Sequence, residues 1–179
     1  QRPADHQCAA IAGRGIVRPP RAELLAQART SIAAGSQSFA AASLLFDPAT
    51  RERTHLLYAW CRRCDDIADG QDHGGALADD GSDPRERLAI IRQLTARALA
   101  GEATGDFAFD SLGEVAAECG LTASQCEAVI GGFALDTAAW QPRSEGDLMR
   151  YCFHVAGAVG VLMARVMGVP PEAGATLDA

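Results

Sequence analysis

A long helix is the strongest structural signal in this sequence. Asp47-Pro48 is typical of a helix start, because Asp favours the N-cap position and Pro is tolerated at the first helical residue. From there the pattern predicts a helix to about Ala68, with an apolar centre at residues 56–60. Its last part, DDIAD at residues 65–69, places three carboxylates in an otherwise apolar pattern.

Four chemically active side chains share one face of this predicted helix, at spacings of three and four residues. They are Tyr58, Arg62, Asp65 and Asp69. Like charges four residues apart repel each other, as Asp65 and Asp69 would, and a cation between them relieves the repulsion. Mg²⁺ binds few protein carboxylates and shares its remaining positions with phosphate oxygens. The pattern therefore predicts a helical enzyme that holds a diphosphate through Mg²⁺, with Mn²⁺ as the alternative ion.

The competing interpretation is a solvated polar stripe, in which Arg62 and Asp65 form an ordinary surface pair. Tyr58 disfavours this interpretation, because it lies in the most apolar part of the helix. A stripe that starts in the core and becomes acidic indicates a cavity lined by polar groups.

The rest of the chain also follows helical patterns. Further helices are predicted at about 21–35, 82–101, 106–119, 122–142 and 144–167, with a short apolar piece at 40–46. Residues 1–20 are expected to be an irregular lead-in and residues 70–81 an exposed loop, because Gly, Pro and Asp are frequent there. No strand pattern or domain boundary interrupts the chain, so we predict one all-α domain over residues 21–179.

Composition excludes several classes of function. The net charge is −7 and all 16 basic residues are Arg, which leaves no basic surface for nucleic acid. The longest apolar run, residues 155–163, is too short to span a bilayer, and residues 1–21 lack the apolar core of a signal peptide. We expect a cytoplasmic protein without a transmembrane segment, in peripheral contact with a membrane at most.

Cys61 and Cys64 form a C-x-x-C pair, yet neither a second pair nor a pair of histidines completes a zinc site. We interpret them as reduced thiols that pack in a helix, and a metal or thiol regulator remains the alternative.

Two later segments put polar or small residues into apolar helical patterns. Asp136 needs an Arg or metal partner if it is buried, and is otherwise an exposed residue near a helix end. Gly157 and Gly160 follow Tyr151 within a predicted helix, where they permit a kink or the close approach of a helix or ligand. His154 is expected on the helix surface.

Four ordered segments of the chain resemble the squalene/phytoene synthase family, and most closely its bacterial members. They are SQSFA at 36–40, LYAWCRRCDDIAD at 57–69, GFALD at 132–136 and YCFHVAGAVG at 151–160. The resemblance covers residues from about 22 to the end, and implies an all-α isoprenoid-synthase fold that is truncated here. In that fold, two facing aspartate-rich motifs hold Mg²⁺ over an apolar cavity.

The family joins two prenyl diphosphates head to head. The resemblance implies condensation of two geranylgeranyl diphosphates to phytoene, through a cyclopropylcarbinyl diphosphate, as part of carotenoid biosynthesis. The alternatives are a squalene-type synthase that uses farnesyl diphosphate and a non-catalytic helical fragment that binds lipid.

The resemblance also implies roles for individual residues. Asp65, Asp66 and Asp69 would form the metal site, with Asp65 and Asp69 as the main ligands and Asp66 as their neighbour. Arg62 would contact the diphosphate. Tyr58 and Tyr151 would line the cavity near the reacting carbons. The substrate-binding set would consist of Ser36, Ser38, Asp136 and Gly157.

Two departures from the family pattern affect these expectations. Gln37 occupies a position where the family usually has a basic residue, so one positive charge for the diphosphate is missing. The second aspartate-rich motif is absent from these 179 residues. We therefore expect a fragment that is inactive alone and that leaves apolar helix faces uncovered.

Overall fold

The computed structural model describes residues 16–72, 75–76 and 83–170, and the all-α prediction is confirmed. Most of the predicted lead-in, residues 1–15, lies outside the described residues. The helices are α1 (Arg21–Gly35), α2 (Gln37–Ser43), α3 (Pro48–Asp69), α4 (Pro84–Leu99), α5 (Phe107–Cys119), α6 (Ala123–Thr137), α7 (Glu145–Cys152), the π-helical η1 (Phe153–Gly157) and α8 (Ala158–Val166). Within the predicted loop, β1 (Gln71–Asp72) and β2 (Gly75–Ala76) pair antiparallel.

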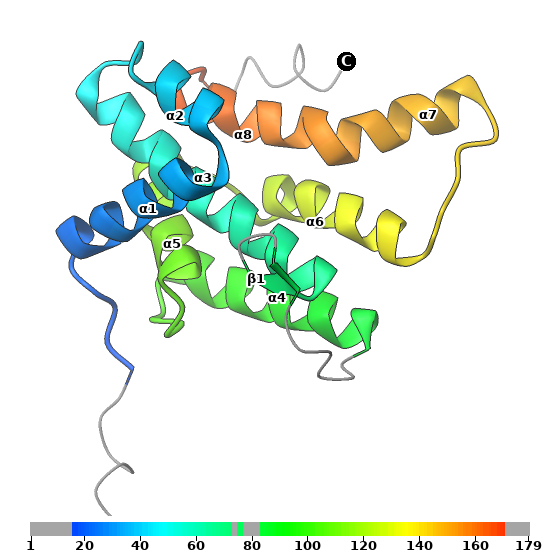
Figure 1. Cartoon of the computed structure of the whole chain (residues 1–179), viewed down its shortest axis with the longest axis horizontal. Helices are drawn as coiled ribbons and strands as arrows, with labels where there is room; N and C mark the ends of the chain where they lie inside the picture. Colours follow the sequence, from blue (N-terminus) through cyan, green and yellow to red (C-terminus); the bar gives the residue numbers. More distant parts are fainter. Residues whose placement is uncertain (1–15, 73–74, 77–82, 171–179) are drawn as a thin grey trace, which may run out of the picture.

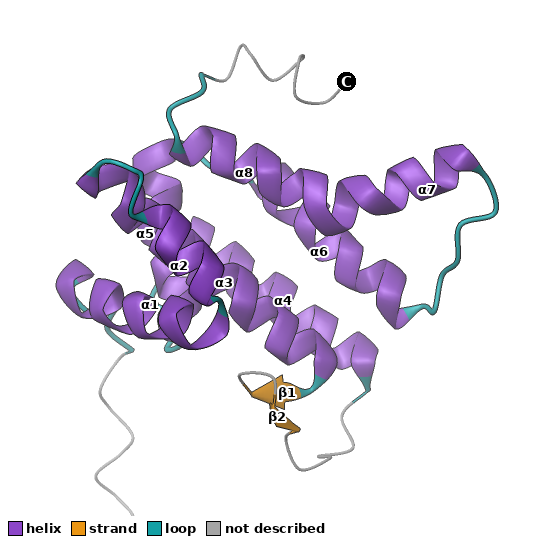
Figure 2. Cartoon of the chain, turned by 45° about the horizontal axis from the view of Figure 1, so that its top comes forward, coloured by secondary structure: helices purple, strands orange, loops and turns teal. Residues whose placement is uncertain are grey.

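Helix α3 occupies the centre of the bundle, where it contacts α1, α4, α5, α6 and α8 (Figure 1). It begins as the sequence predicts, because the Asp47 side chain accepts hydrogen bonds from the backbone N–H groups of Ala49 and Thr50. It ends at Gly70, whose φ of 64° lies in the left-handed region that favours glycine. Figure 2 shows α7 and α8 running end to end above α6.

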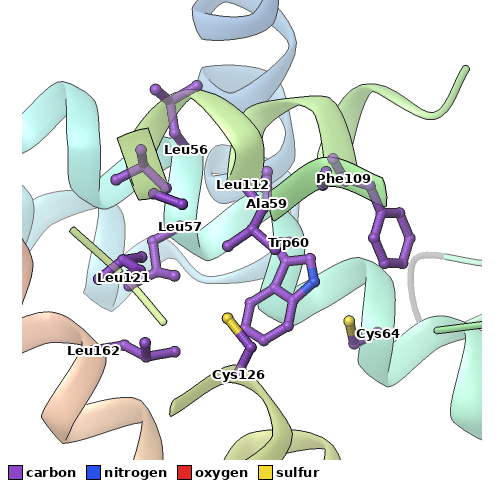
Figure 3. Packing of buried hydrophobic residues seen from close by; sticks show 14 of the residues in the cluster. Leu56, Leu57, Ala59, Trp60, Cys64, Phe109, Leu112, Leu121, Cys126 and Leu162 are labelled. Carbon is purple, nitrogen blue, oxygen red and sulfur yellow. The ribbon is translucent and has the colours of Figure 1, made fainter. Parts of the chain in front are cut away.

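The core lies between α3 and the helices around it. Trp60 of α3 is fully buried among Phe109 and Leu112 of α5 and Leu162 of α8 (Figure 3). Its indole Nε1 donates to the Thr95 hydroxyl of α4 at 3.3 Å, so the one polar atom of the ring is satisfied. Of the described helices, none is long and apolar enough to cross a bilayer.

The structure differs from the predicted helical segments at three places. Residues 37–43 form the short helix α2, where the sequence predicted only a short apolar piece at 40–46. Helix α6 ends at Thr137, so Trp140 lies beyond it, after Ala139 with a φ of 49°. The predicted helix at 144–167 is divided by η1, a π-helical turn in which the backbone is underwound.

A buried hydrogen bond between Ser43 and His55 attaches the end of α2 to α3. The Ser43 hydroxyl lies 2.9 Å from Nε2 of His55, and both residues are buried. Burial lowers the pKa of His55 below 6.5, and the cations Arg29 and Arg51 lower it further, against Glu52.

This shifted pKa predicts how stability changes with pH. The unfolded chain binds the His55 proton more readily than the native chain, so the contribution of the neutral ring is present above about pH 6.5 and lost as pH falls through the folded-state pKa. We expect the free energy of unfolding in urea to fall between about pH 7.5 and 5. His55→Gln should reduce that slope, and an unchanged slope in this variant would contradict the assignment.

Candidate functional site

A cavity of about 340 Å³ lies beside the chemically active face of α3. Its lining comes from α3 (Tyr58, Cys61, Arg62, Asp65), α6 (Val129, Gly132, Phe133, Asp136) and the η1–α8 segment (His154, Val155, Val159). Three of the four residues on the predicted stripe thus meet at one cavity. Asp136, which is far from them in sequence, faces the same space.

Asp65 lies among charged groups at the acidic end of this cavity. Burial raises the pKa of its carboxyl above the usual value, and the neighbouring charge of Asp69 raises it further, against the opposing effect of Arg62. More distant Asp136 acts in the same direction as Asp69. The carboxylates therefore repel one another, and a divalent cation would relieve this repulsion. Their oxygen atoms are the ligands that Mg²⁺ prefers, so the residues present fit this ion.

Arg62 makes ion pairs with two consecutive aspartates. Its Nη1 donates to Asp65 Oδ2 at 3.0 Å, and its Nη2 lies 2.7 Å from Asp66 Oδ1 in a close contact that is not an aligned hydrogen bond. Asp66 is only 3% exposed and does not line the site cavity. Instead it faces a second cavity of about 430 Å³, together with Arg63 and Asp110. The geometry therefore favours Asp65 over Asp66 as a metal ligand.

Asp136 is exposed, which is one of the two alternatives that the sequence left open, and it is paired with a tyrosine. The Tyr151 hydroxyl donates to its Oδ1 at 2.8 Å. The Arg or metal partner was expected only if this carboxylate were buried. This hydrogen bond raises the pKa of Tyr151, whose ring stacks on Trp140 with centroids 6.2 Å apart. Tyr151 thus contacts the cavity lining at Asp136 but is not itself a lining residue.

Tyr58 connects the cavity to the turn between α1 and α2. Its hydroxyl lies so close to Gly35 that a Cβ at that position would overlap it, and its ring stacks on Phe39 at 5.7 Å. Burial raises the pKa of the Tyr58 phenol, so the hydroxyl stays protonated. Ser36 follows Gly35 and caps α2 by accepting a hydrogen bond from the Phe39 N–H at 3.3 Å. Its Oγ lies 3.5 Å from Oγ of Ser38.

The expectation that His154 is a surface residue is wrong. His154 is half-buried, lines the cavity, and places its Nδ1 2.7 Å from the Ala128 carbonyl oxygen. Because a carbonyl can only accept, Nδ1 is the donor. This approach requires the two glycines of α6, since a Cβ on Gly131 or Gly132 would lie 3.0 Å from atoms of His154. The glycine pair was the only sequence signal for this contact.

Several predicted site residues are not among those that line the cavity. They are Ser36, Ser38, Asp66, Asp69, Tyr151 and Gly157. Asp69 is exposed at the last residue of α3, one turn from Asp65. Gly157 is exposed at the end of η1, where a Cβ would lie 3.1 Å from the Phe153 ring.

The close contact at Gly132 gives a testable prediction. Gly132→Ala would bring a Cβ to 3.0 Å from the backbone oxygen of His154, which cannot move without shifting η1. We expect a loss of about 1–3 kcal/mol in the free energy of unfolding in urea. The matched control is Gly160→Ala in α8, where no atom lies within 4 Å of the added Cβ. It should gain up to about 1 kcal/mol through helix propensity. Equal effects at both positions would contradict the packing argument.

The cysteine pair offers little for metal or thiol chemistry. Cys64 is fully buried in the core, and burial raises the pKa of Cys61 to about 12, so its thiol stays protonated. Within the described ranges, no group of three or more His, Cys, Asp and Glu side chains is placed to hold a metal ion by itself.

Comparison with known proteins gives consistent matches. Residues 32–179 match the squalene/phytoene synthase family. A phytoene synthase of Pseudescherichia vulneris is 46% identical and a 15-cis-phytoene synthase of Pantoea ananas 41% identical, each over 87% of this chain and 50% of the relative. A presqualene diphosphate synthase of Zymomonas mobilis is 35% identical over 80% of this chain and 47% of its own length.

Among solved structures, a dehydrosqualene synthase in complex with a ligand superposes with a TM-score of 0.68 and 22% sequence identity. The match covers 82% of this chain and 48% of that one, and it shows an isoprenoid-synthase fold. The chain thus spans about half the length of the curated relatives that it matches.

Proposed function

The chain belongs to the squalene/phytoene synthase family, and on this premise we propose that the whole protein condenses two geranylgeranyl diphosphates head to head to form phytoene. One observation carries the proposal. A single cavity gathers a phenol, a guanidinium and two carboxylates, from Tyr58, Arg62, Asp65 and Asp136, against walls of Val and Phe side chains.

The polar end of the cavity would hold the diphosphate. Arg62 offers a planar set of N–H donors that suits phosphate oxygens. Asp65 and Asp69 would hold Mg²⁺, or Mn²⁺ in its place, with Asp66 fixing Arg62 from behind. When bound, the metal would supply charge that stabilises a departing diphosphate. Ser36 and Ser38 would add hydroxyl donors, although Gln37 brings no charge.

The apolar end would hold the prenyl chains. Val129, Phe133 and Val159 exclude water from the carbon skeleton, which protects a reactive cation from hydrolysis. The protonated phenol of Tyr58 also lines the cavity, where its ring would face the reacting carbons. Tyr151 would act from the rim, oriented by Asp136. Gly157 would leave room for substrate along η1.

Two other functions remain open to the same site. A squalene-type synthase would use farnesyl diphosphate, and the presqualene diphosphate synthase among the relatives supports this alternative. A non-catalytic helical unit would keep the apolar cavity for lipid binding alone. We propose a cytoplasmic location, with peripheral membrane contact because the product is apolar.

Product analysis tests the proposal. The whole protein is incubated with Mg²⁺ and either isotope-labelled geranylgeranyl or farnesyl diphosphate, and the products are separated and identified by mass. Phytoene from the C20 substrate supports the proposal, whereas a C30 product from farnesyl diphosphate alone supports the squalene-type alternative. If neither wild type nor Asp65→Ala/Asp69→Ala shows turnover and both bind lipid equally, the result supports the non-catalytic lipid-binding unit. The same assay on residues 1–179 tests whether this chain is inactive alone.

A further inference from the structure

A third pocket lies near the start of α3, away from the candidate site. It has a volume of about 410 Å³ and is lined by Arg29, Leu44, Pro48, Arg51, Glu52 and His55. It sits where the turn after α2 meets α1 and α3. The residues proposed for prenyl diphosphate chemistry do not contribute to it.

Positive charge is in excess around this pocket. Arg51 has no ion-pair partner among the described residues, and the Arg29 side chain is 59% exposed, with only a 3.4 Å contact to Glu52. Glu52 is already held more closely, at 2.6 Å, by Arg21. The Asp47 carboxylate nearby is engaged by backbone N–H groups at the start of α3. Two arginines are thus available to an anion on a chain whose net charge is −7.

A buried polar atom at the pocket lacks a partner. The Ser43 hydroxyl donates to the Ala40 carbonyl at 2.7 Å, so Oγ must accept from the Nε2–H of His55. In the neutral ring, Nδ1 is then a free acceptor, and it is buried without a hydrogen-bond partner in a residue only 8% exposed. His55, which lines the pocket, therefore carries a buried acceptor without a partner.

Two adjacent leucines project beside the pocket. Leu44, which lines it, is 66% exposed, and Leu45 is 89% exposed. They follow α2 in the turn at the edge of the molecule (Figure 1). The surface of a bilayer with acidic lipids is anionic, and its interior is apolar. The exposed leucines suit that interior, and the neighbouring arginines, of which Arg29 is only loosely paired, suit that surface.

We infer that the turn at Leu44 and Leu45, with Arg29, Arg51 and His55, docks the protein on an anionic membrane. The leucines enter the boundary between headgroups and acyl chains. The arginines bind a lipid phosphate, and His55 lies beside them in the pocket wall. This inference rests on the peripheral contact proposed above but not on the catalytic residues. Vesicle binding is measured without substrate. Loss of vesicle binding with turnover retained would therefore overturn only this inference, and loss of turnover with vesicle binding retained would overturn only the proposed function.

Vesicle co-sedimentation of the purified protein tests this surface. The vesicles contain phosphatidylcholine alone or phosphatidylcholine mixed with phosphatidylglycerol. We expect binding to the mixed vesicles only, weakened by salt. Arg29→Gln/Arg51→Gln should lower the partition coefficient about thirtyfold, from the typical contribution of two arginines near such a surface. Leu44→Ser/Leu45→Ser should lower it by at least as much. If that double variant unfolds, the same assay is made with Leu45→Ser alone, which changes only the more exposed leucine and should also lower vesicle binding.

Matched controls alter equivalent residues elsewhere. Leu148→Ser/Met149→Ser changes an adjacent exposed apolar pair on α7, and Arg85→Gln/Arg143→Gln removes two exposed arginines. Both should bind vesicles as the wild type does. Equal losses in controls and test variants would overturn the inference, as would equal binding to neutral vesicles. Binding of inorganic phosphate that requires Arg29 and Arg51, without vesicle binding, would assign the pocket to a soluble anion instead.

Discussion

Replacing Asp65 by Asn should lower turnover of the whole protein about a hundred- to thousandfold, the loss typical when one group that stabilises developing charge is removed. The variant keeps the size of the side chain, and Asp65 is half-exposed at the cavity, so the fold should tolerate it. With one carboxylate fewer, the Mg²⁺ concentration for half-maximal activity should rise. Steady-state assays with labelled geranylgeranyl diphosphate at several Mg²⁺ concentrations measure both effects.

The matched control is Asp66→Asn at the neighbouring position. Asp66 is buried and pairs with Arg62 outside the site cavity, so its loss should lower the free energy of unfolding by about 1–3 kcal/mol. Residual activity of the folded fraction should exceed that of Asp65→Asn. If both variants lose activity and Mg²⁺ affinity equally while remaining stable, Asp66 is a metal ligand and the geometric distinction is wrong.

Trp60→Ala should cost about 3–5 kcal/mol of unfolding free energy, the typical cost of removing a buried aromatic ring. Trp60 is fully buried at the centre of the core, and its removal also leaves the Thr95 hydroxyl without its indole donor. Since a domain of ordinary stability has only about 5–15 kcal/mol in total, a large fraction of the variant should unfold on mild heating. Urea unfolding followed by circular dichroism measures the change.

Trp140→Ala makes the same chemical change outside the core. Trp140 lies beyond the end of α6 and contacts the Tyr151 ring in a stacked pair. We expect a cost of about 1 kcal/mol, the usual value of an aromatic pair. A cost as large as that of Trp60→Ala would mean that the core is centred elsewhere.

The fold was predictable wherever local signals determine it. The N-cap Asp47, the Pro after it and the left-handed Gly70 all act within one turn, so the bounds of α3 could be predicted within a residue or two. Helix α2 has only seven residues, too few for a periodic pattern. Contacts with α3, through Ser43 to His55 and Phe39 to Tyr58, stabilise it from outside.

The candidate site shows the same limit. Helical spacing predicts that Tyr58, Arg62 and Asp65 share a face, and the structure gives them a common cavity. Spacing within α3 does not show which residues of other helices lie opposite these three side chains. The Tyr151 bond to Asp136 and the entry of His154 depend on how α6 and η1 pack, which no local pattern determines.

The guanidinium of Arg62 has a consequence for ligand affinity. One terminal nitrogen stays with buried Asp66, while the other contacts half-exposed Asp65. An incoming anion can therefore replace Asp65 as a partner of Arg62 while the contact between Arg62 and Asp66 is kept. Little rotamer freedom is lost in that exchange, so more of the interaction energy contributes to affinity.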